Sequence, residues 1–330
     1  MTNRADVLLV TERAWLRFGD RVTAAAPGLR ALLMQADGSL RLDGAEVAWD
    51  AAVPDIVWGT ADLFDDDGPV RPFFSLLRRL PSVVWFQSPA AGTDAPVFAE
   101  LLAKGVRMTT SHVTDIPIAE FVLASVLGHY QRVPDWRQAQ ADRVWRRHDF
   151  REVDGTTWLI VGLGSIGTAV AVRAAAFGAR VIGCRRHPSG NEPVDRMVHP
   201  GELLDTVPEA DVVVLAAPAT AATAELVNAG FLDRMREGSM LVNIARGSLV
   251  DEAALLAALD RGRPEAAVLD VVNEEPLPAE SPLWGHPRVM LTPHNSAGGL
   301  GRYARAATLF CDNLERYLAG RPLRNEISAA

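Results

Sequence analysis

The stretch WLIVGLGSIG (residues 158–167) joins an apolar run to a glycine-rich turn. Gly162, Gly164 and Gly167 have the GxGxxG spacing, after a predicted strand and at the start of a predicted helix over residues 165–177. In this context the first glycine permits a tight turn, the second admits a pyrophosphate, and the third lets helix and strand pack closely. The stretch therefore predicts a dinucleotide site at the helix N-terminus. We assign to it the residues Gly162, Gly164, Ser165, Ile166 and Gly167.

Short apolar runs alternate with Ala-rich helical stretches on both sides of this turn, which is the pattern of a parallel sheet with crossover helices. Around the turn we predict strands at 158–161, 181–183, 212–216, 240–244, 267–270 and 289–291. In the first third we predict strands near 7–10, 31–34, 56–58 and 83–86, with helices such as 73–80 and 96–104. The predicted fold class is α/β: two Rossmann-like or flavodoxin-like lobes with doubly wound parallel sheets and an active site in the cleft between them.

The same pattern predicts the domain organisation. We expect residues 1–116 to form the first part of a substrate domain, residues 117–296 a dinucleotide-binding domain, and residues 297–330 a C-terminal helix that returns to the substrate domain. A long helix is predicted after Asp115, which can cap its first turn, while Pro117 suits its opening positions. The Arg-rich segment 136–150 is either a solvated helix or an arm that contacts a second copy.

The composition limits the partners. The 330 residues include 33 Lys or Arg and 41 Asp or Glu, for a net charge of -8, and the basic residues are scattered among acids. We therefore expect no nucleic acid partner. No apolar run approaches the roughly 20 residues of a bilayer-spanning helix, so we expect no membrane partner.

The cysteines and histidines limit the compartment and the chemistry. Two cysteines, Cys184 and Cys311, cannot build a disulfide framework, and residues 1–10 do not resemble a secretion leader, so we expect the cytoplasm. The seven histidines include no HExxH pair and the cysteines no CxxC pair. We therefore expect no metal site.

The residues after the second strand of the glycine-rich domain indicate the cofactor. NAD sites normally place an acid there, on the ribose hydroxyls, about 20 residues beyond the glycines. This chain instead has Arg185 and Arg186. Paired guanidinium groups suit a ribose 2′-phosphate, with which they form charge-assisted hydrogen bonds. We predict a preference for NADP(H), with NAD(H) as the alternative if both arginines are only surface charges.

Three charged side chains follow predicted strands of the same sheet: Arg246, Glu275 and His294. Ligands of open parallel sheets bind just past the C-terminal ends of the strands. Reduction of a 2-oxo acid requires a cation for the carboxylate and carbonyl, a proton donor for the new hydroxyl, and a partner that keeps the donor charged. A carboxylate beside an imidazole favours the protonated ring, so this set of side chains suits that reaction.

The motifs around these residues resemble the D-isomer-specific 2-hydroxyacid dehydrogenase family. They are Asn243-Ile244-Ala245-Arg246-Gly247, Leu269-Asp270-Val271 with Glu275-Pro276, and Leu291-Thr292-Pro293-His294. The resemblance is densest over residues 155–321 and extends to the first lobe through Gly92-Thr93-Asp94 and Ala119-Glu120. It implies that Arg246 binds the substrate carboxylate and polarises the carbonyl, that His294 is the general acid/base, and that Glu275 orients and charges His294.

The resemblance also implies supporting roles and a glyoxylate/hydroxypyruvate reductase type of activity. It assigns Pro218, Ala245 and Asp270 to the cofactor, Asp270 as the acceptor for the nicotinamide carboxamide, and Ala91 and Gly92 to the substrate carboxylate. A homodimer is expected, with residues 133–150 as the candidate interface.

Two alternatives stay open. The superfamily also includes dinucleotide-sensing corepressors, which retain the fold and much of the site, so the fold alone does not decide. We expect a corepressor to carry a long appended tail, whereas this chain ends with residues 328–330 soon after its last predicted helix. The triad also fits a phosphite-type dehydrogenase, while Glu275 argues against a formate dehydrogenase, which carries Gln there.

Overall fold

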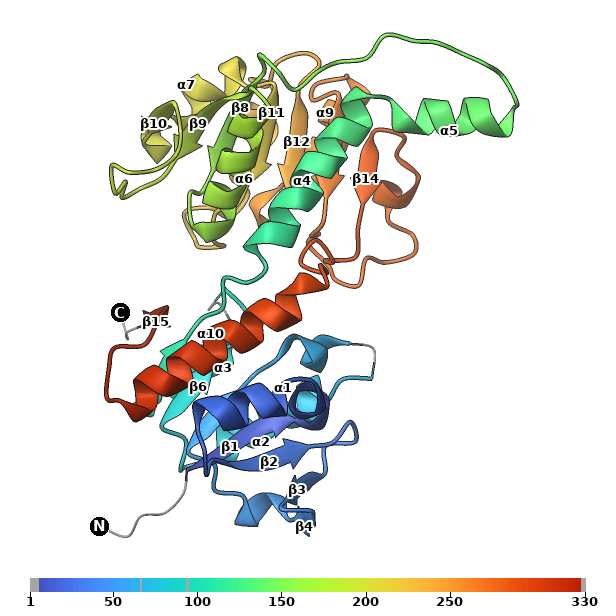
Figure 1. The fold of residues 1–330 in the computed structure, drawn as a ribbon. Coiled ribbons are helices and arrows are strands. Elements are labelled where there is room, and N and C mark those ends of the chain that lie inside the picture. The colour runs from blue at the N-terminus through green and yellow to red at the C-terminus, as the bar shows by residue number, and fades with distance from the viewer. Residues whose placement is uncertain (1–5, 66, 93–94, 328–330) are drawn as a thin grey trace. The chain divides into compact units, whose positions relative to one another are not determined.

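The computed structural model describes residues 6–65, 67–92 and 95–327, and the chain divides into two compact units (Figure 1). The first unit comprises Met1–Thr114 and Leu300–Ala330, and the second comprises Asp115–Gly299. Each unit is a mainly parallel sheet with helices on its faces, which confirms the α/β fold class.

The first unit contains an eight-stranded sheet. Its strands are β1 (Val7–Thr11), β2 (Arg30–Met34), β3 (Leu40–Leu42), β4 (Ala45–Val47), β5 (Ile56–Trp58), β6 (Trp85–Gln87), β7 (Arg107–Thr109) and β15 (Glu326–Ile327). They lie in the order β15-β7-β6-β5-β1-β2-β3-β4. The five strands from β7 to β2 are parallel, and β3, β4 and β15 pair antiparallel. The parallel strands follow the 2-1-3-4-5 order of flavodoxin-like sheets.

Helices cover both faces of this sheet. They are α1 (Glu12–Ala25), α2 (Val70–Arg79), α3 (Pro96–Ala103) and α10 (Gly301–Leu318), with 3-10 turns η1 (Trp49–Ala51) and η2 (Ala61–Phe64). Leu8 of β1 belongs to a cluster with Phe310 of α10, while its neighbour Leu9 belongs to a cluster with Phe73 of α2. Successive strand residues point to opposite faces, so the apolar run of β1 buries both sides.

The second unit contains a seven-stranded sheet. Its strands are β8 (Thr157–Val161), β9 (Arg180–Cys184), β10 (Arg196–Val198), β11 (Val212–Leu215), β12 (Met240–Asn243), β13 (Ala266–Leu269) and β14 (Val289–Leu291). They lie in the order β10-β9-β8-β11-β12-β13-β14, and all neighbouring pairs are parallel. The order reverses beside β8, which is the switch point where such sheets bind ligands.

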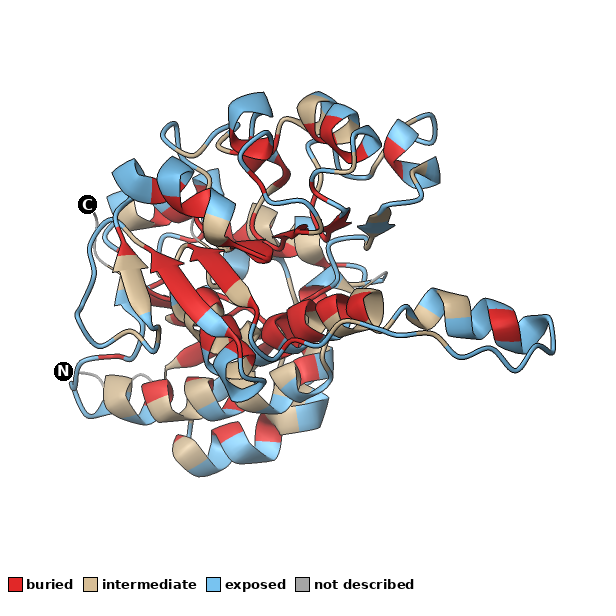
Figure 2. Ribbon diagram, turned by 90° about the horizontal axis from the view of Figure 1, so that it is seen from above, coloured by how far each residue is buried: buried red, intermediate tan, exposed pale blue. Residues whose placement is uncertain are grey.

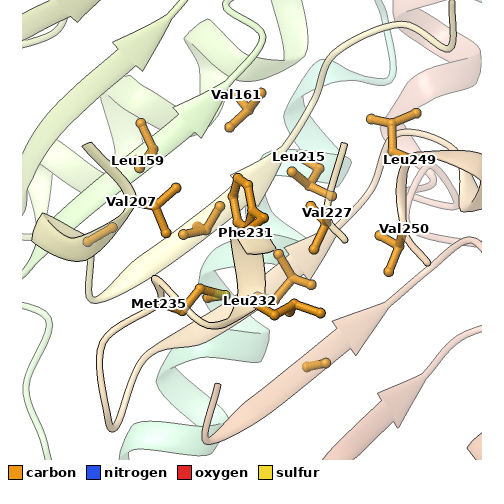
Figure 3. Packing of buried hydrophobic residues seen from close by; sticks show 14 of the residues in the cluster. Leu159, Val161, Val207, Leu215, Val227, Phe231, Leu232, Met235, Leu249 and Val250 are labelled. Atoms are coloured by element: carbon orange, nitrogen blue, oxygen red, sulfur yellow. The ribbon is translucent and has the colours of Figure 1, made fainter. Parts of the chain in front are cut away.

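The helices of the second unit are α4 (Asp115–Tyr130), α5 (Val133–Ala141), α6 (Ser165–Ala176), α7 (Leu203–Thr206), α8 (Ala229–Leu232) and α9 (Glu252–Asp260), with 3-10 turns η3 (Pro200–Glu202), η4 (Val207–Glu209), η5 (Gly247–Leu249) and η6 (Pro282–Gly285). Both faces of the central sheet are buried, and β11, β12 and β13 are buried at every position (Figure 2). Trp158 and Ile160 face α4 and α6, whereas Leu159 and Val161 face a cluster around Phe231 of α8 (Figure 3). In the described part of the chain no helix combines the length and apolarity needed to cross a bilayer.

Two local predictions for the second unit are wrong. The segment 136–150 is not one helix, because α5 ends at Ala141 and Arg143 has a φ of 59°, a left-handed conformation that a right-handed helix cannot contain. The segment 133–150, which we call the arm, consists of α5 and an irregular return (Figure 2). Asp115 is the first residue of α4 rather than the cap before it, and its carboxylate accepts a hydrogen bond from the Ser165 hydroxyl at 3.2 Å.

Candidate active site

All seven strands of the second unit end at the same level. One row of paired residues crosses the sheet at these ends: Val198, Cys184, Val161, Leu215, Asn243, Leu269 and Leu291. The loops that carry Gly162, Arg246 and His294 all begin just past this row. Neighbouring strands lie about 4.8 Å apart, so the ends of β12 and β14 are separated by about 10 Å. The register therefore brings the loops of Arg246 and His294 to one edge of the sheet.

The glycine turn after β8 has the geometry that a diphosphate requires. Gly162 has a φ of 98°, and a Cβ there would lie 2.5 Å from the backbone nitrogen of Ala217. A Cβ on Gly167 would lie 2.0 Å from the carbonyl oxygen of Gly162, so only glycine permits this packing of α6 on β8. A Cβ on Gly164 would meet no atom within 4 Å, so there is open space beside the residue that precedes α6. Open space at the N-terminus of a helix, where the first backbone N–H groups point out of the helix, fits a pyrophosphate.

His294 and Glu275 form a hydrogen-bonded pair. His294 Nδ1 lies 2.8 Å from Glu275 Oε2, and Glu275 Oε1 accepts a hydrogen bond from the backbone N–H of Val272 at 3.2 Å. Both side chains are partly exposed. The pair fixes the direction of the imidazole, so that Nε2, on the far side of the ring, faces away from Glu275. An imidazole held in this way by a carboxylate can donate or accept a proton at Nε2.

A buried carboxylate holds the turn that carries His294. Asp270 is 2% exposed, and its Oδ1 accepts hydrogen bonds from the Thr292 hydroxyl at 2.7 Å and from the backbone N–H of Asn295 at 2.8 Å. The backbone N–H and the hydroxyl of Ser296 donate to the same carboxylate. His294 itself has a φ of 51°, an uncommon conformation for a residue with a side chain. The contacts of Asp270 on both sides of His294 stabilise that conformation.

A buried amide holds the turn that carries Arg246. Asn243 is fully buried; its Oδ1 accepts from the backbone N–H of Ala245 at 3.1 Å, and its Nδ2 donates to the carbonyl of Arg246 at 2.9 Å. The half-buried Arg246 side chain donates from Nη1 to the carbonyl of Ala245 at 2.7 Å. A Cβ on Gly247 would lie 2.0 Å from the carbonyl carbon of Val272, so the next residue must be glycine. The direction of Arg246 is thus set by its neighbours on both sides.

Two arginines follow β9. Arg185 Nη1 lies 3.1 Å from Glu192 Oε1, and Arg186 is exposed. The preceding Cys184 is buried, and burial raises the pKa of its thiol to about 11, so it stays protonated near neutral pH. Beyond β11, Pro218 is exposed, and its carbonyl accepts from the Thr223 hydroxyl at 2.7 Å.

Ala91 and Gly92 belong to the first unit, in the loop after β6. Both are partly buried, and the loop is tied to the end of β7 because the backbone N–H of Ser111 donates to the carbonyl of Ala90 at 3.0 Å. Thr93 and Asp94, which complete the motif in this loop, lie outside the described residues.

The sequence interpretation gave no role to Asn243 or Glu192. The signal for Asn243 was present, because an amide at the end of a buried apolar strand needs partners and asparagine often bonds to the backbone two residues on. The six residues between Arg185 and Glu192 gave no comparable signal. Over residues 6–65, 67–92 and 95–327 we find no cluster of three or more His, Cys, Asp or Glu side chains able to hold a metal ion.

Comparison with known proteins places these features in context. Residues 123–296 match the family model described as D-isomer specific 2-hydroxyacid dehydrogenase, NAD binding domain. The glyoxylate/hydroxypyruvate reductase A of Salmonella heidelberg (strain SL476) is 32% identical over 215 residues, which are 65% of this chain and 68% of that protein.

Solved structures resemble the whole chain. A D-isomer specific 2-hydroxyacid dehydrogenase family protein from Aeromonas salmonicida has a TM-score of 0.80 at 30% identity, and the match covers 99% of both chains. A D-isomer specific 2-hydroxyacid dehydrogenase from Xanthobacter autotrophicus Py2, solved in complex with NADPH and MES, has a TM-score of 0.76 at 29% identity over 98% of both chains.

Proposed function

The chain belongs to the D-isomer specific 2-hydroxyacid dehydrogenase family and is an NAD(P)-dependent oxidoreductase, and on that premise we propose that it interconverts a small 2-oxo acid and its D-2-hydroxy acid. The observation that carries the proposal is the 2.8 Å contact between His294 and Glu275 at the sheet edge that also bears the glycine turn. The family includes glyoxylate/hydroxypyruvate reductases, so glyoxylate and hydroxypyruvate are the first substrates to consider.

Three side chains act in the proposed reaction. When bound, the nicotinamide supplies the hydride that reaches the carbonyl carbon. Arg246 binds the substrate carboxylate and polarises the carbonyl, since a guanidinium forms charge-assisted bonds to both oxygens. His294 donates a proton from Nε2 to the carbonyl oxygen, and the new hydroxyl leaves with the product. Glu275 stabilises the protonated imidazole before the transfer.

The remaining predicted residues keep the roles proposed for them. We propose that Gly162, Gly164, Ser165, Ile166 and Gly167 bind the pyrophosphate and that Pro218 and Ala245 contact the cofactor. Asp270 remains the proposed acceptor for the nicotinamide carboxamide. Rotation of the Ser296 or Thr292 hydroxyl, which both donate to the Asp270 carboxylate, would free an oxygen lone pair for the carboxamide. Ala91 and Gly92 remain the proposed backbone donors to the substrate carboxylate. The cytoplasmic location stays a prediction.

A substrate screen with both cofactors tests the function. We expect oxidation of NADPH with glyoxylate, hydroxypyruvate or a related 2-oxo acid, and kcat/KM at least about tenfold higher with NADPH than with NADH because Arg185 and Arg186 suit a 2′-phosphate. Absorbance of the reduced cofactor gives the rates. If cofactor binds but no 2-oxo acid is reduced, the dinucleotide-sensing alternative is favoured, and oxidation of phosphite alone would favour the phosphite-type alternative.

We also propose that two copies associate through the arm. Trp145 is 93% exposed there, and Trp136 packs edge-on against Phe150 with ring centroids 5.8 Å apart. The arm is anchored at its return by Arg151, which donates to Asp211 Oδ1 and to the carbonyl of Gly238, both at 2.7 Å. An anchored segment that exposes a large aromatic side chain has the character of an interface hot spot.

Light scattering tests this association. The wild-type protein is expected to have twice the mass of one chain at micromolar concentration, and Trp145→Asp is expected to weaken dimerisation by at least about tenfold, as loss of a central aromatic contact does. Leu204→Asp, at another exposed apolar position of the same unit, is the matched control and should leave the mass unchanged. A monomeric wild type would contradict the proposed homodimer.

A further inference from the structure

The loop from Arg185 to Glu192 lies beside the glycine turn. The backbone N–H of Gly162 donates to the carbonyl of Cys184 at 2.9 Å, directly before the loop. A Cβ on Gly183 would lie 2.0 Å from Leu163 Cδ1, so the end of β9 and the glycine turn are in contact. The loop is therefore next to the site that we propose for the dinucleotide, on the side where doubly wound sheets bind the ribose.

One carboxylate organises this loop. The side chain of Glu192 is 5% exposed, and its Oε1 accepts from the backbone N–H of Ser189 at 2.6 Å and from the Ser189 hydroxyl at 2.9 Å. The same oxygen accepts from Arg185 Nη1 at 3.1 Å, while Oε2 accepts from the backbone N–H of Gly190 at 2.9 Å. The hydrogen bonds from Ser189 lower the pKa of Glu192 to about 2, so the carboxylate is ionised at any working pH.

The contact between Glu192 and Arg185 leaves most of the guanidinium available. A guanidinium has five N–H donors, and Glu192 engages one of those of Arg185. The Arg185 side chain is 41% exposed. A long side chain that is held before the ligand arrives loses less rotamer freedom on binding, which raises affinity. The buried carboxylate can thus hold Arg185 in place while the partly exposed guanidinium keeps other donors for a ligand.

We propose that Glu192 is a positioning residue that determines the cofactor choice: it closes the loop and holds Arg185 for the 2′-phosphate of NADP. This inference rests on the proposed preference for NADP(H). Glu192 acts through Arg185 and the turn at Ser189 and Gly190, and it does not touch the reacting atoms.

A different role for the same carboxylate would be to accept the ribose hydroxyls, as the acid of an NAD site does. Its four donors and its burial count against that role, because a carboxylate surrounded by protein donors has little capacity left for a hydroxyl. The two roles predict opposite results. Loss of a positioning residue should weaken the binding of NADPH, whereas loss of a ribose acceptor should weaken the binding of NADH.

Steady-state kinetics of Glu192→Ala and Glu192→Gln with both cofactors separates these roles. We expect KM for NADPH to rise about tenfold in both variants. The kcat values with either cofactor and the KM for NADH should change by less than about twofold. Gln keeps the length of the side chain, but it has only one acceptor oxygen and would set its amide hydrogens against an N–H of the turn. If Glu192 acted only through its negative charge, Glu192→Gln would instead bind NADPH more tightly, because the neutral side chain no longer repels the phosphate.

The control is Glu209→Ala, which removes a partly exposed ion pair with Arg196 of β10, outside the loop from Arg185 to Glu192, and should leave both cofactors unaffected. Titration of NADP followed by tryptophan fluorescence gives the affinity of any variant with poor turnover. Equal kcat/KM for both cofactors in the wild type would contradict the proposed cofactor choice. The role of Glu192 alone would be overturned if the wild type prefers NADPH but the Glu192 variants keep the same ratio of kcat/KM for NADPH to kcat/KM for NADH. Equal losses of kcat/KM for both cofactors would have the same meaning.

Discussion

Replacing His294 by alanine is expected to lower kcat for 2-oxo acid reduction by roughly 10²–10⁴-fold, the usual contribution of a positioned general acid. The imidazole is held through Nδ1 by Glu275 at 2.8 Å, and a water molecule that replaced the ring would be a weaker acid without that fixed direction. Binding of NADPH should be unchanged, because the glycine turn lies after β8 and His294 after β14. Steady-state rates at saturating substrate, with NADPH affinity from a fluorescence titration, give both quantities.

Two further variants sharpen this experiment. Glu275→Gln should reduce kcat in the same direction but less, because the amide can still hold the ring while it no longer stabilises the positive charge. His199→Ala, which removes the exposed histidine that caps η3, is the matched control and should keep kcat within about twofold. A His294→Ala enzyme with wild-type kcat would remove His294 from the mechanism.

The central part of the sheet in the second unit was predictable because β8, β9, β11, β12 and β13 are buried on both faces. All six predicted strands around the glycine turn exist, from β8 to β14, since continuous apolar runs of this kind leave few alternatives. The three-residue edge strand β10 was missed, because Arg196-Met197-Val198 is half-buried and has no apolar run. The hairpin of β3 and β4 was also missed, although Asp43-Gly44 between them is a strong hairpin signal.

The pairing of Glu275 with His294 was more predictable than the contacts that hold their loops in place. Glu275 and His294 were paired from their motifs, and the structure brings them into contact. The contacts of Asp270 with Thr292 and Ser296 depend on the path of a turn with a left-handed residue at its centre. Such a path follows from tertiary packing and not from local preference, because His294 would rarely adopt that conformation alone.

Replacing Arg246 by alanine is expected to lower kcat/KM for a 2-oxo acid by about 10²–10³-fold, as the loss of a donor to a developing oxyanion does. The Arg246 variant should also differ from the His294 variant in its KM for the 2-oxo acid. Arg246 binds the carboxylate in the ground state as well as the transition state, so KM should rise while kcat falls. The turn should persist in the variant, because the amide of Asn243 bonds to the backbone of residues 245 and 246 and not to the guanidinium.

Arg246→Lys and added guanidinium test whether geometry or charge matters at this position. Lysine keeps the charge but lacks the planar fork, so we expect kcat/KM between those of the wild type and the alanine variant. Guanidinium ion added to Arg246→Ala should restore part of the rate, since it returns the lost donors to the space that the side chain leaves. Arg261→Ala, which breaks an exposed ion pair with Asp233 in the same unit, controls for the loss of one positive charge. If Arg246→Ala kept the wild-type KM and kcat, the substrate carboxylate would have to bind elsewhere. The proposal that the aligned ends of β12 and β14 bring Arg246 and His294 to one catalytic site would then be wrong.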